Sequence, residues 1–135
     1  MNKENPKYKL HLTVTELYPN ILEQIEIYRK AGVNIENHGW TDPMGLFERC
    51  MVQVYPSLIE SFGLGLIESV ESGCELLAAD LPYVHEVIEA AGWFDPNDPQ
   101  SIAESVLTYH PSNLKLTSKI KIKNEIDQII KKLTN

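Results

Sequence analysis

The residues of this sequence with the clearest chemical potential lie between positions 54 and 73 (VYPSLIESFGLGLIESVESG). Gly63 and Gly65 keep the backbone approachable at the point where a helix is predicted to start. Unpaired amides at a helix N-terminus favour an anion such as a diphosphate. Glu68, about one turn into the helix, can reach back to accept hydrogen bonds from two sugar hydroxyls, as acidic residues do with ribose in dinucleotide sites.

Glu60 lies in the preceding loop, on the other side of this phosphate position. Its carboxylate suits the hydroxyls of a transferred sugar or partial positive charge near an anomeric carbon. Phe62, between the two glutamates, is expected either to pack against a ligand or to lean into the core. The alternative for Glu60 and Glu68 is that both are solvated carboxylates without a ligand.

Other reactive residue types are expected to be structural. His38 and His85 fall near the predicted ligand edge as hydrogen-bonded residues, and His11 is expected on a strand face. Cys50 and Cys74 are too few for a disulfide framework or a metal cage and are expected in the core. Because metal-ligand spacing is absent, we predict neither a metal ion nor a cofactor.

The elements that position these residues follow from apolar spacing. Period-two or continuous apolar runs predict strands at residues 9–15, 33–38, 52–55, 76–79 and 92–94. Helical spacing and capping residues predict helices at 20–31, 42–51, 64–72, 84–90 and 98–107. This order predicts an α/β fold with a Rossmann-like, mostly parallel sheet of about five strands and helices on both faces.

Two segments are predicted along the chain. Residues 1–111 form the α/β domain, and residues 112–135 form a lysine-rich amphipathic C-terminal helix. Ligands of parallel sheets bind outside the carboxyl ends of the strands. That edge is expected to contain Thr15–Leu17, Gly39–Thr41, Pro56–Gly63 and Asp80–Tyr83. Trp40 and Trp93 are expected to be packing residues.

The charge distribution narrows the range of partners. The 135 residues carry a net charge of −7, and no Lys or Arg occurs from Cys50 to Leu114, where ten Asp and Glu are found. A nucleic-acid partner is not expected, because the body of the chain offers no basic face for phosphates. No apolar run is long enough for a membrane span and the N-terminus lacks a signal-peptide core, so a cytoplasmic location is expected.

The ordered frame around the two glutamates resembles a known family. Pro56, Ser57, Glu60, Phe62-Gly63 and Glu68 stand in the register of the signature of glycosyltransferase family 4, which has the GT-B fold. The segments 35–41 (IENHGWT), 76–80 (LLAAD) and 93–106 (WFDPNDPQSIAESV) resemble neighbouring parts of that family's C-terminal domain. The resemblance covers residues 9 to about 107.

The resemblance implies a retaining transfer of a sugar from a nucleotide-sugar donor to a glycan, lipid or small acceptor. Glu60 would be the catalytic residue that contacts the donor sugar, and Glu68 would bind the ribose. The donor-binding segment would also include Ser61, and the amides of Phe62, Gly63 and Leu64 would face the diphosphate. The family needs no divalent metal at this site.

The sequence departs from the family near its N-terminus. The family's C-terminal domain normally begins one strand and one helix before Lys9, with an Arg and a Lys that neutralise the diphosphate. We therefore expect a C-terminal half that lacks this unit and the acceptor-binding N-terminal domain, and expect the isolated chain to be inactive. The alternative is a truncated or degenerate, non-catalytic module that binds nucleotide or only associates with a partner.

The missing strand would lie near the middle of the family's sheet, between the counterparts of residues 9–15 and 52–55. Its absence would leave an edge of unpaired amides and carbonyls, which invites association. We expect a rearranged sheet, or a partner chain or homodimer that completes it.

Overall fold

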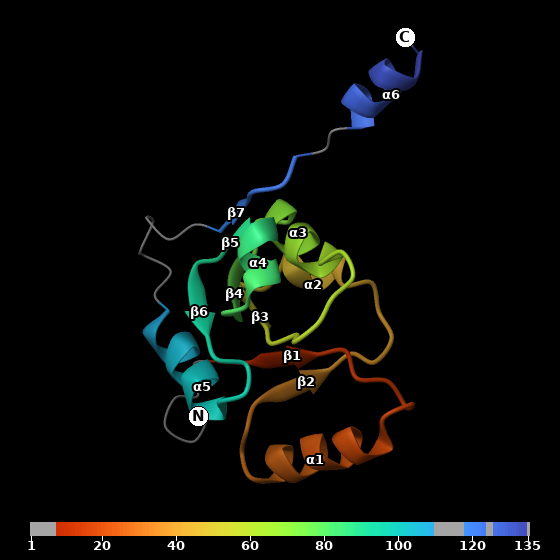
Figure 1. The fold of residues 1–135 in the computed structure, drawn as a ribbon. Helices are drawn as coiled ribbons and strands as arrows, with labels where there is room; N and C mark the ends of the chain where they lie inside the picture. The colour runs from red at the N-terminus through yellow and green to blue at the C-terminus, as the bar shows by residue number, and fades with distance from the viewer. Residues whose placement is uncertain (1–7, 110–117, 124–125, 135) are drawn as a thin grey trace. The chain divides into compact units, whose positions relative to one another are not determined.

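The described residues form two units, which divide between Leu46 and Phe47. A computed structural model describes residues 8–109, 118–123 and 126–134, with strands and helices alternating along most of this length (Figure 1). None of the helices in the described ranges is long and apolar enough to cross a membrane.

The first unit is a strand–helix–strand motif. Strand β1 (Leu10–Leu12), helix α1 (Pro19–Lys30) and strand β2 (Ile35–Asn37) follow one another, and α2 (Met44–Phe47) begins at its end. β1 and β2 are parallel, with Leu10 opposite Ile35 and Leu12 opposite Asn37. Pro19 starts α1, where its missing amide hydrogen is harmless, and Arg29 and Lys30 complement the helix dipole in the last turn.

The Asn37 side chain extends the pairing beyond β1. Its amide nitrogen donates to the Val14 carbonyl at 2.9 Å, and its oxygen accepts from the Val14 amide at 2.8 Å. One side chain therefore takes the place of a neighbouring strand at this point, and it fixes the segment that leaves the carboxyl end of β1.

The second unit contains the remaining elements, which are β3 (Val52–Tyr55), α3 (Leu64–Glu71), β4 (Glu75–Ala79), α4 (Pro82–Val87), β5 (Ile88–Glu89), β6 (Gly92–Phe94), α5 (Pro99–Thr108), β7 (Lys119–Ile120) and α6 (Ile126–Thr134). The strands β3, β4 and β6 form a parallel sheet with β4 in the centre. The side chain of Asp98 caps α5 by accepting from the Gln100 amide at 2.9 Å, as expected from the sequence.

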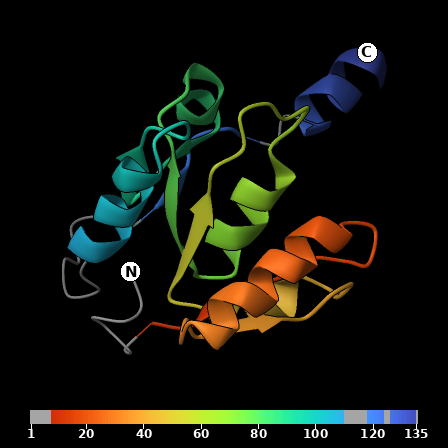
Figure 2. The same ribbon diagram turned by 90° about the horizontal axis from the view of Figure 1, so that it is seen from below.

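The central strand β4 supplies both halves of the core. Leu76 and Ala78 face one side, where Leu66 of α3, Val84 of α4 and Ile88 of β5 pack around them. Leu77 and Ala79 face the other side, where they pack against Phe94 of β6 and Val106 of α5. Alternate residues of a strand point to opposite faces, so the continuous apolar run needs cover on both. Figure 2 shows α3 and α5 on opposite sides of the sheet, and the predicted parallel α/β class with flanking helices is confirmed.

Three predicted helical regions differ in the structure. The helix predicted at 42–51 is limited to α2 (Met44–Phe47). The helix predicted at 84–90 runs from Pro82 to Val87 and gives way to β5. The helix predicted over 112–135 is present only as α6 (Ile126–Thr134) among the described residues, because β7 occupies Lys119–Ile120 and pairs antiparallel with β5. Ser118 lies directly before β7, and its hydroxyl accepts from the buried amide of Leu76 at 2.9 Å, which ties this part of the chain to β4.

The strand pairings within each unit are confirmed as parallel for β1–β2 and for β3–β4–β6. The expected rearrangement of the sheet, its completion by a partner chain and the boundary at residue 111 stay predictions. Residues 110–117 lie outside the described part of the chain.

Candidate functional site

The loop between β3 and α3 carries the first part of the predicted site. Pro56 ends β3, and the Ser57 hydroxyl then lies 3.0 Å from Oε1 of Glu60 and 3.1 Å from the carbonyl oxygen of Ile59. From α4, the Tyr83 hydroxyl donates to the Ser57 carbonyl at 2.7 Å. These contacts give the loop a defined path and hold the exposed Glu60 carboxylate beside Ser57.

Tyr55 constrains Glu60 from the last position of β3. Burial of the phenol raises the pKa of Tyr55, and its hydrogen bond with the Glu60 carboxylate raises this pKa further. Tyr55 is therefore protonated at neutral pH and serves as a donor to Glu60. The Glu60 carboxylate accepts hydrogen bonds from the Tyr55 phenol and the Ser57 hydroxyl, and these bonds hold it in position as an acceptor for a ligand.

Gly63 forms the start of α3. It has φ of 65° and ψ of 34°, the left-handed conformation that glycine adopts without steric cost. The carbonyl of Gly63 accepts the first helical bond, from the Leu66 amide at 3.0 Å. Among the described residues no side chain caps this end of the helix, so the amides of the first turn are open to an anionic ligand.

Glu68 follows in the second turn of α3 and is half-buried. With the described residues its carboxylate makes no hydrogen bond or ion pair, whereas the Glu60 carboxylate is held by Tyr55 and Ser57. One glutamate is thus fixed by the protein, and the other keeps its acceptor capacity for a ligand.

The remaining predicted residues line the same short stretch of backbone. Ser61, Phe62 and Leu64 are exposed, and Gly63 is buried. The Phe62 ring is 77% exposed, so the alternative that Phe62 leans into the core is wrong for this structure. Leu58 and Ile59 are exposed as well, which places several apolar side chains around Glu60.

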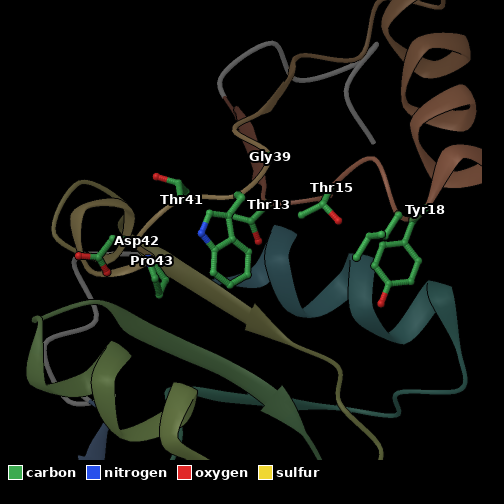
Figure 3. A pocket seen from close by; sticks show the side chains of 9 residues that line it. Thr13, Thr15, Tyr18, Gly39, Thr41, Asp42 and Pro43 are labelled. Atoms are coloured by element: carbon green, nitrogen blue, oxygen red, sulfur yellow. The ribbon is translucent and has the colours of Figure 1, made fainter.

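A separate hollow of about 730 Å³ lies within the first unit, at the carboxyl ends of β1 and β2. Figure 3 shows residues from both strand ends around it. Its lining residues are Thr13, Thr15, Leu17, Tyr18, Gly39, Trp40, Thr41, Asp42 and Pro43. The predicted ligand edge at 15–17 and 39–41 is therefore hollowed, as expected for parallel strands.

Two residues that line this hollow, Trp40 and Thr15, are suited to contact a small-molecule ligand. Trp40 is 93% exposed, so the expectation that Trp40 is a packing residue is wrong. The Thr15 hydroxyl is buried and has no hydrogen-bond partner among the described residues. A buried hydroxyl without a partner is costly, and an aromatic surface beside it suits a polar ring such as a sugar or a nucleobase.

The other reactive residues have structural surroundings. His85 pairs with Asp80 at 2.6 Å and stacks on Trp93 with a centroid distance of 3.7 Å, which confirms Trp93 as a packing residue. Cys74 is buried and Cys50 is half-buried, and both are free.

Parts of this chain are similar to bacterial mannosyltransferases. It is 35% identical over 57 residues to the O-antigen chain mannosyltransferase RfbU of Salmonella typhimurium, a match that covers 42% of this chain and 16% of RfbU. It is 37% identical over 65 residues to the serotype-specific mannosyltransferase WbdA of Escherichia coli, which covers 45% of this chain and 8% of WbdA. The chain therefore spans less than a fifth of the length of these relatives.

The model of the family described as glycosyl transferases group 1 matches residues 15–126. This match includes β2, most of the residues that line the hollow, the 56–68 segment and the three-stranded sheet of the second unit. Because it covers most of the sequence, the chain belongs to the glycosyl transferases group 1 family.

Proposed function

We propose that this chain is the donor-binding domain of a retaining glycosyltransferase and that the 56–68 segment binds a nucleotide sugar. The observation that carries the proposal is the uncapped start of α3 at Gly63, with Glu60 before it and Glu68 after it. The family assignment supports glycosyl transfer as the reaction class.

Each residue has a role in this proposal. The amides of Phe62, Gly63 and Leu64 bind the donor diphosphate, and Glu68 accepts two hydrogen bonds from the ribose hydroxyls. Glu60, held by Tyr55 and Ser57, accepts from a hydroxyl of the donor sugar near its anomeric carbon, and Ser61 lies in the same donor-binding segment. The domain acts by positioning the donor and by stabilising charge on the leaving diphosphate.

The donor class follows from the relatives. RfbU and WbdA are named mannosyltransferases, so we propose mannose as the transferred sugar. The hollow beside Trp40 supports a ligand of the same chemical class, since its lining combines an aromatic surface with threonine hydroxyls.

The charge pattern favours a second candidate for the isolated chain, a non-catalytic module that binds nucleotide weakly. No Lys or Arg occurs from Cys50 to Leu114, so within that stretch only backbone amide dipoles are available to oppose the two charges of a diphosphate. We expect a dissociation constant of about 0.1–1 mM, equivalent to roughly 4–5.5 kcal/mol of binding free energy.

Calorimetric titration with GDP-mannose, UDP-glucose and GDP tests the site. Glu68→Ala should weaken nucleotide binding by about tenfold, the loss of roughly 1.4 kcal/mol expected for hydrogen bonds to a charged acceptor. Glu71→Ala is the matched control, because Glu71 lies on the same helix and is exposed, and it should bind as the unaltered chain does.

Each result separates the candidates. Binding that weakens only in Glu68→Ala, together with sugar transfer when the remaining domain of the enzyme is supplied, supports the enzyme. The same binding without transfer supports the non-catalytic module. Absence of binding at 10 mM nucleotide (about 2.7 kcal/mol) contradicts both.

A further inference from the structure

Three potential metal ligands come together on the two-stranded sheet of the first unit. His11 lies on β1 directly opposite Glu36 on β2, and His38 follows Glu36 by two residues. Residues two apart on a strand point to the same face. The register therefore places two imidazoles and one carboxylate on a single face, although they are 25 and 27 positions apart along the chain.

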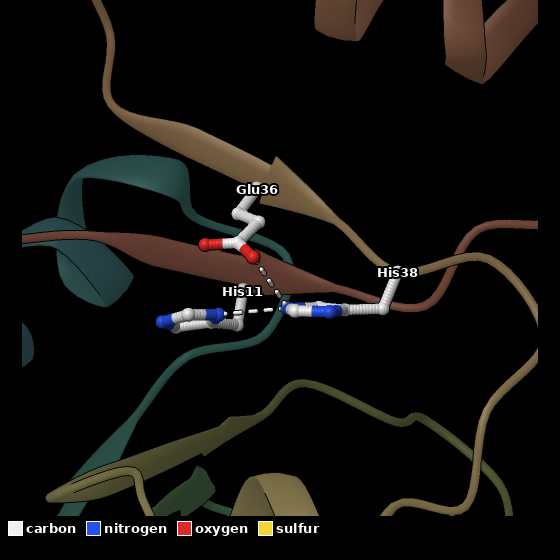
Figure 4. Close-up of side chains that lie close together, drawn as sticks. All are labelled: His11, Glu36 and His38. Carbon is white, nitrogen blue, oxygen red and sulfur yellow. Dashed lines mark hydrogen bonds and ion pairs between the residues drawn. The ribbon is translucent and has the colours of Figure 1, made fainter.

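The side chains approach one another closely (Figure 4). Nδ1 of His11 lies 2.9 Å from Nε2 of His38, and that same Nε2 lies 3.8 Å from Oε1 of Glu36. All three ligand atoms fall within 4.8 Å of one another, and all three residues are half-buried. The sequence-based expectation of no metal site considered spacing along the chain, which does not show a cluster formed across two strands.

We propose that His11, Glu36 and His38 form a binding site for a zinc-type transition-metal ion. Two imidazole nitrogens and one carboxylate oxygen are a ligand set that zinc accepts, with a water molecule or another ligand in the fourth position. The ion would join β1 to β2. This site shares no residue with the proposed donor-binding segment and does not depend on it.

Small movements convert the cluster into a coordination sphere. Tetrahedral zinc with bonds of about 2.0 Å holds its nitrogen ligands about 3.3 Å apart, so the two nitrogens must separate slightly. The planes of the two rings are now nearly parallel, with an angle of 18° between them, and the rings must tilt so that both lone pairs point at the ion. The ring nitrogen that carries the hydrogen shared between the two imidazoles gives it up to water, and the other nitrogen of the same ring takes one from water, so that both coordinating nitrogens present lone pairs and both imidazoles stay neutral.

Lys9 prepares the carboxylate for this role. Its ammonium lies 2.8 Å from Oε2 of Glu36, which leaves Oε1 directed toward His38. A second group that orients a ligand in this way is usual around protein metal sites.

The test is a titration of the full chain with Zn²⁺ and with Co²⁺, read by calorimetry and by the visible absorption of bound Co²⁺. One ion should bind per chain. His11→Gln and His38→Gln should each weaken binding by about tenfold or more, and Mg²⁺, which prefers oxygen ligands, should not compete. His85→Gln is the control, because His85 pairs with Asp80 in the second unit, and it should retain the affinity of the unaltered chain.

Variant folding is checked by circular dichroism, and a second measurement needs no variant. In the unaltered chain, Zn²⁺ should shift the imidazole nitrogen resonances of His11 and His38 and leave those of His85 in place. The proposal is overturned if no ion binds at about 1 mM metal, if binding survives both histidine substitutions, or if the shifts occur at His85 instead.

Discussion

At the scale of single residues, the two glutamate carboxylates of the candidate site differ in their hydrogen-bond partners. Glu60 is tied to Tyr55 and Ser57, whereas Glu68 makes no hydrogen bond or ion pair with the residues that the structure describes. The sequence shows both glutamates and their spacing equally well. It cannot show which one is fixed, because that depends on a phenol at the end of β3 and on a loop held by Tyr83.

The two cysteines offer a prediction at this scale. Burial raises the pKa of both the Cys50 and the Cys74 thiol, with Cys74 only 2% exposed. A raised pKa means fewer thiolates, the reactive form, at neutral pH. Iodoacetamide should therefore alkylate the native thiols slowly at pH 8, and the rate should rise as the pH increases through the raised pKa values.

Mass spectrometry of Cys50→Ser and Cys74→Ser follows each thiol alone, and the urea-unfolded chain gives the unperturbed rate. Cys74 should react more slowly than Cys50 in the native protein, and both should react alike in urea. Equal rates for Cys74 with and without urea would show that its surroundings do not protect it.

At the scale of elements, the backbone conformation at the start of α3 requires glycine at position 63 but not at position 65. Gly63 has φ of 65°, and a Cβ there would lie 3.1 Å from Cδ1 of Leu66. Gly65 is helical, and a Cβ there would lie 3.5 Å from the Tyr55 ring, an ordinary contact. Two glycines separated by a single residue therefore differ in their tolerance of a side chain.

Gly63→Ala should lower the free energy of unfolding by about 1–2 kcal/mol, the cost of a left-handed conformation for a residue with a side chain. Gly65→Ala should leave it unchanged or raise it by up to about 1 kcal/mol, because alanine favours the helix. Urea denaturation of the two variants beside the unaltered chain measures both changes. A loss of stability for Gly65→Ala equal to that for Gly63→Ala would mean that close packing, and not backbone conformation, sets the requirement.

Much of the architecture could be predicted at this scale. The continuous run Leu76–Ala79 predicted a buried parallel strand, and both faces of β4 are covered. Contacts that depend on pairing between distant residues were missed. The His11–Glu36–His38 cluster forms only because β1 pairs with β2 in one particular register. The hydrogen bonds between Asn37 and Val14 form because the side-chain amide of Asn37 replaces the backbone amide of a neighbouring strand. Apolar periodicity contains neither kind of information.

At the scale of the whole chain, one serine far along the sequence completes the centre of the second unit. The Ser118 hydroxyl accepts from the Leu76 amide at 2.9 Å and donates to Oε2 of Glu75 at 2.8 Å. The backbone amide of Ser118 donates to the same carboxylate oxygen at 2.8 Å. These bonds close a loop of more than forty residues and explain why a strand stands where helical spacing predicted a helix.

Ser118→Ala should lower the free energy of unfolding of the full chain by about 1–3 kcal/mol, the cost of a buried amide left without an acceptor. The variant also loses the hydroxyl bond to Glu75, but that carboxylate keeps the Ser118 backbone amide as a donor. The Ala91 amide, which also approaches the Ser118 hydroxyl, keeps the Leu76 carbonyl at 2.9 Å as its acceptor, so the Leu76 amide is the group left without a partner. Thr108→Ala, which removes an exposed hydroxyl that bonds within α5, is the control and should change stability by less than about 0.5 kcal/mol. Urea denaturation measures the difference, and amide hydrogen exchange at Leu76 locates it: faster exchange at Leu76 with slow exchange at Ala91 is expected. Unchanged exchange at Leu76 would mean that another group takes over as acceptor, and that the position of β7 does not depend on Ser118.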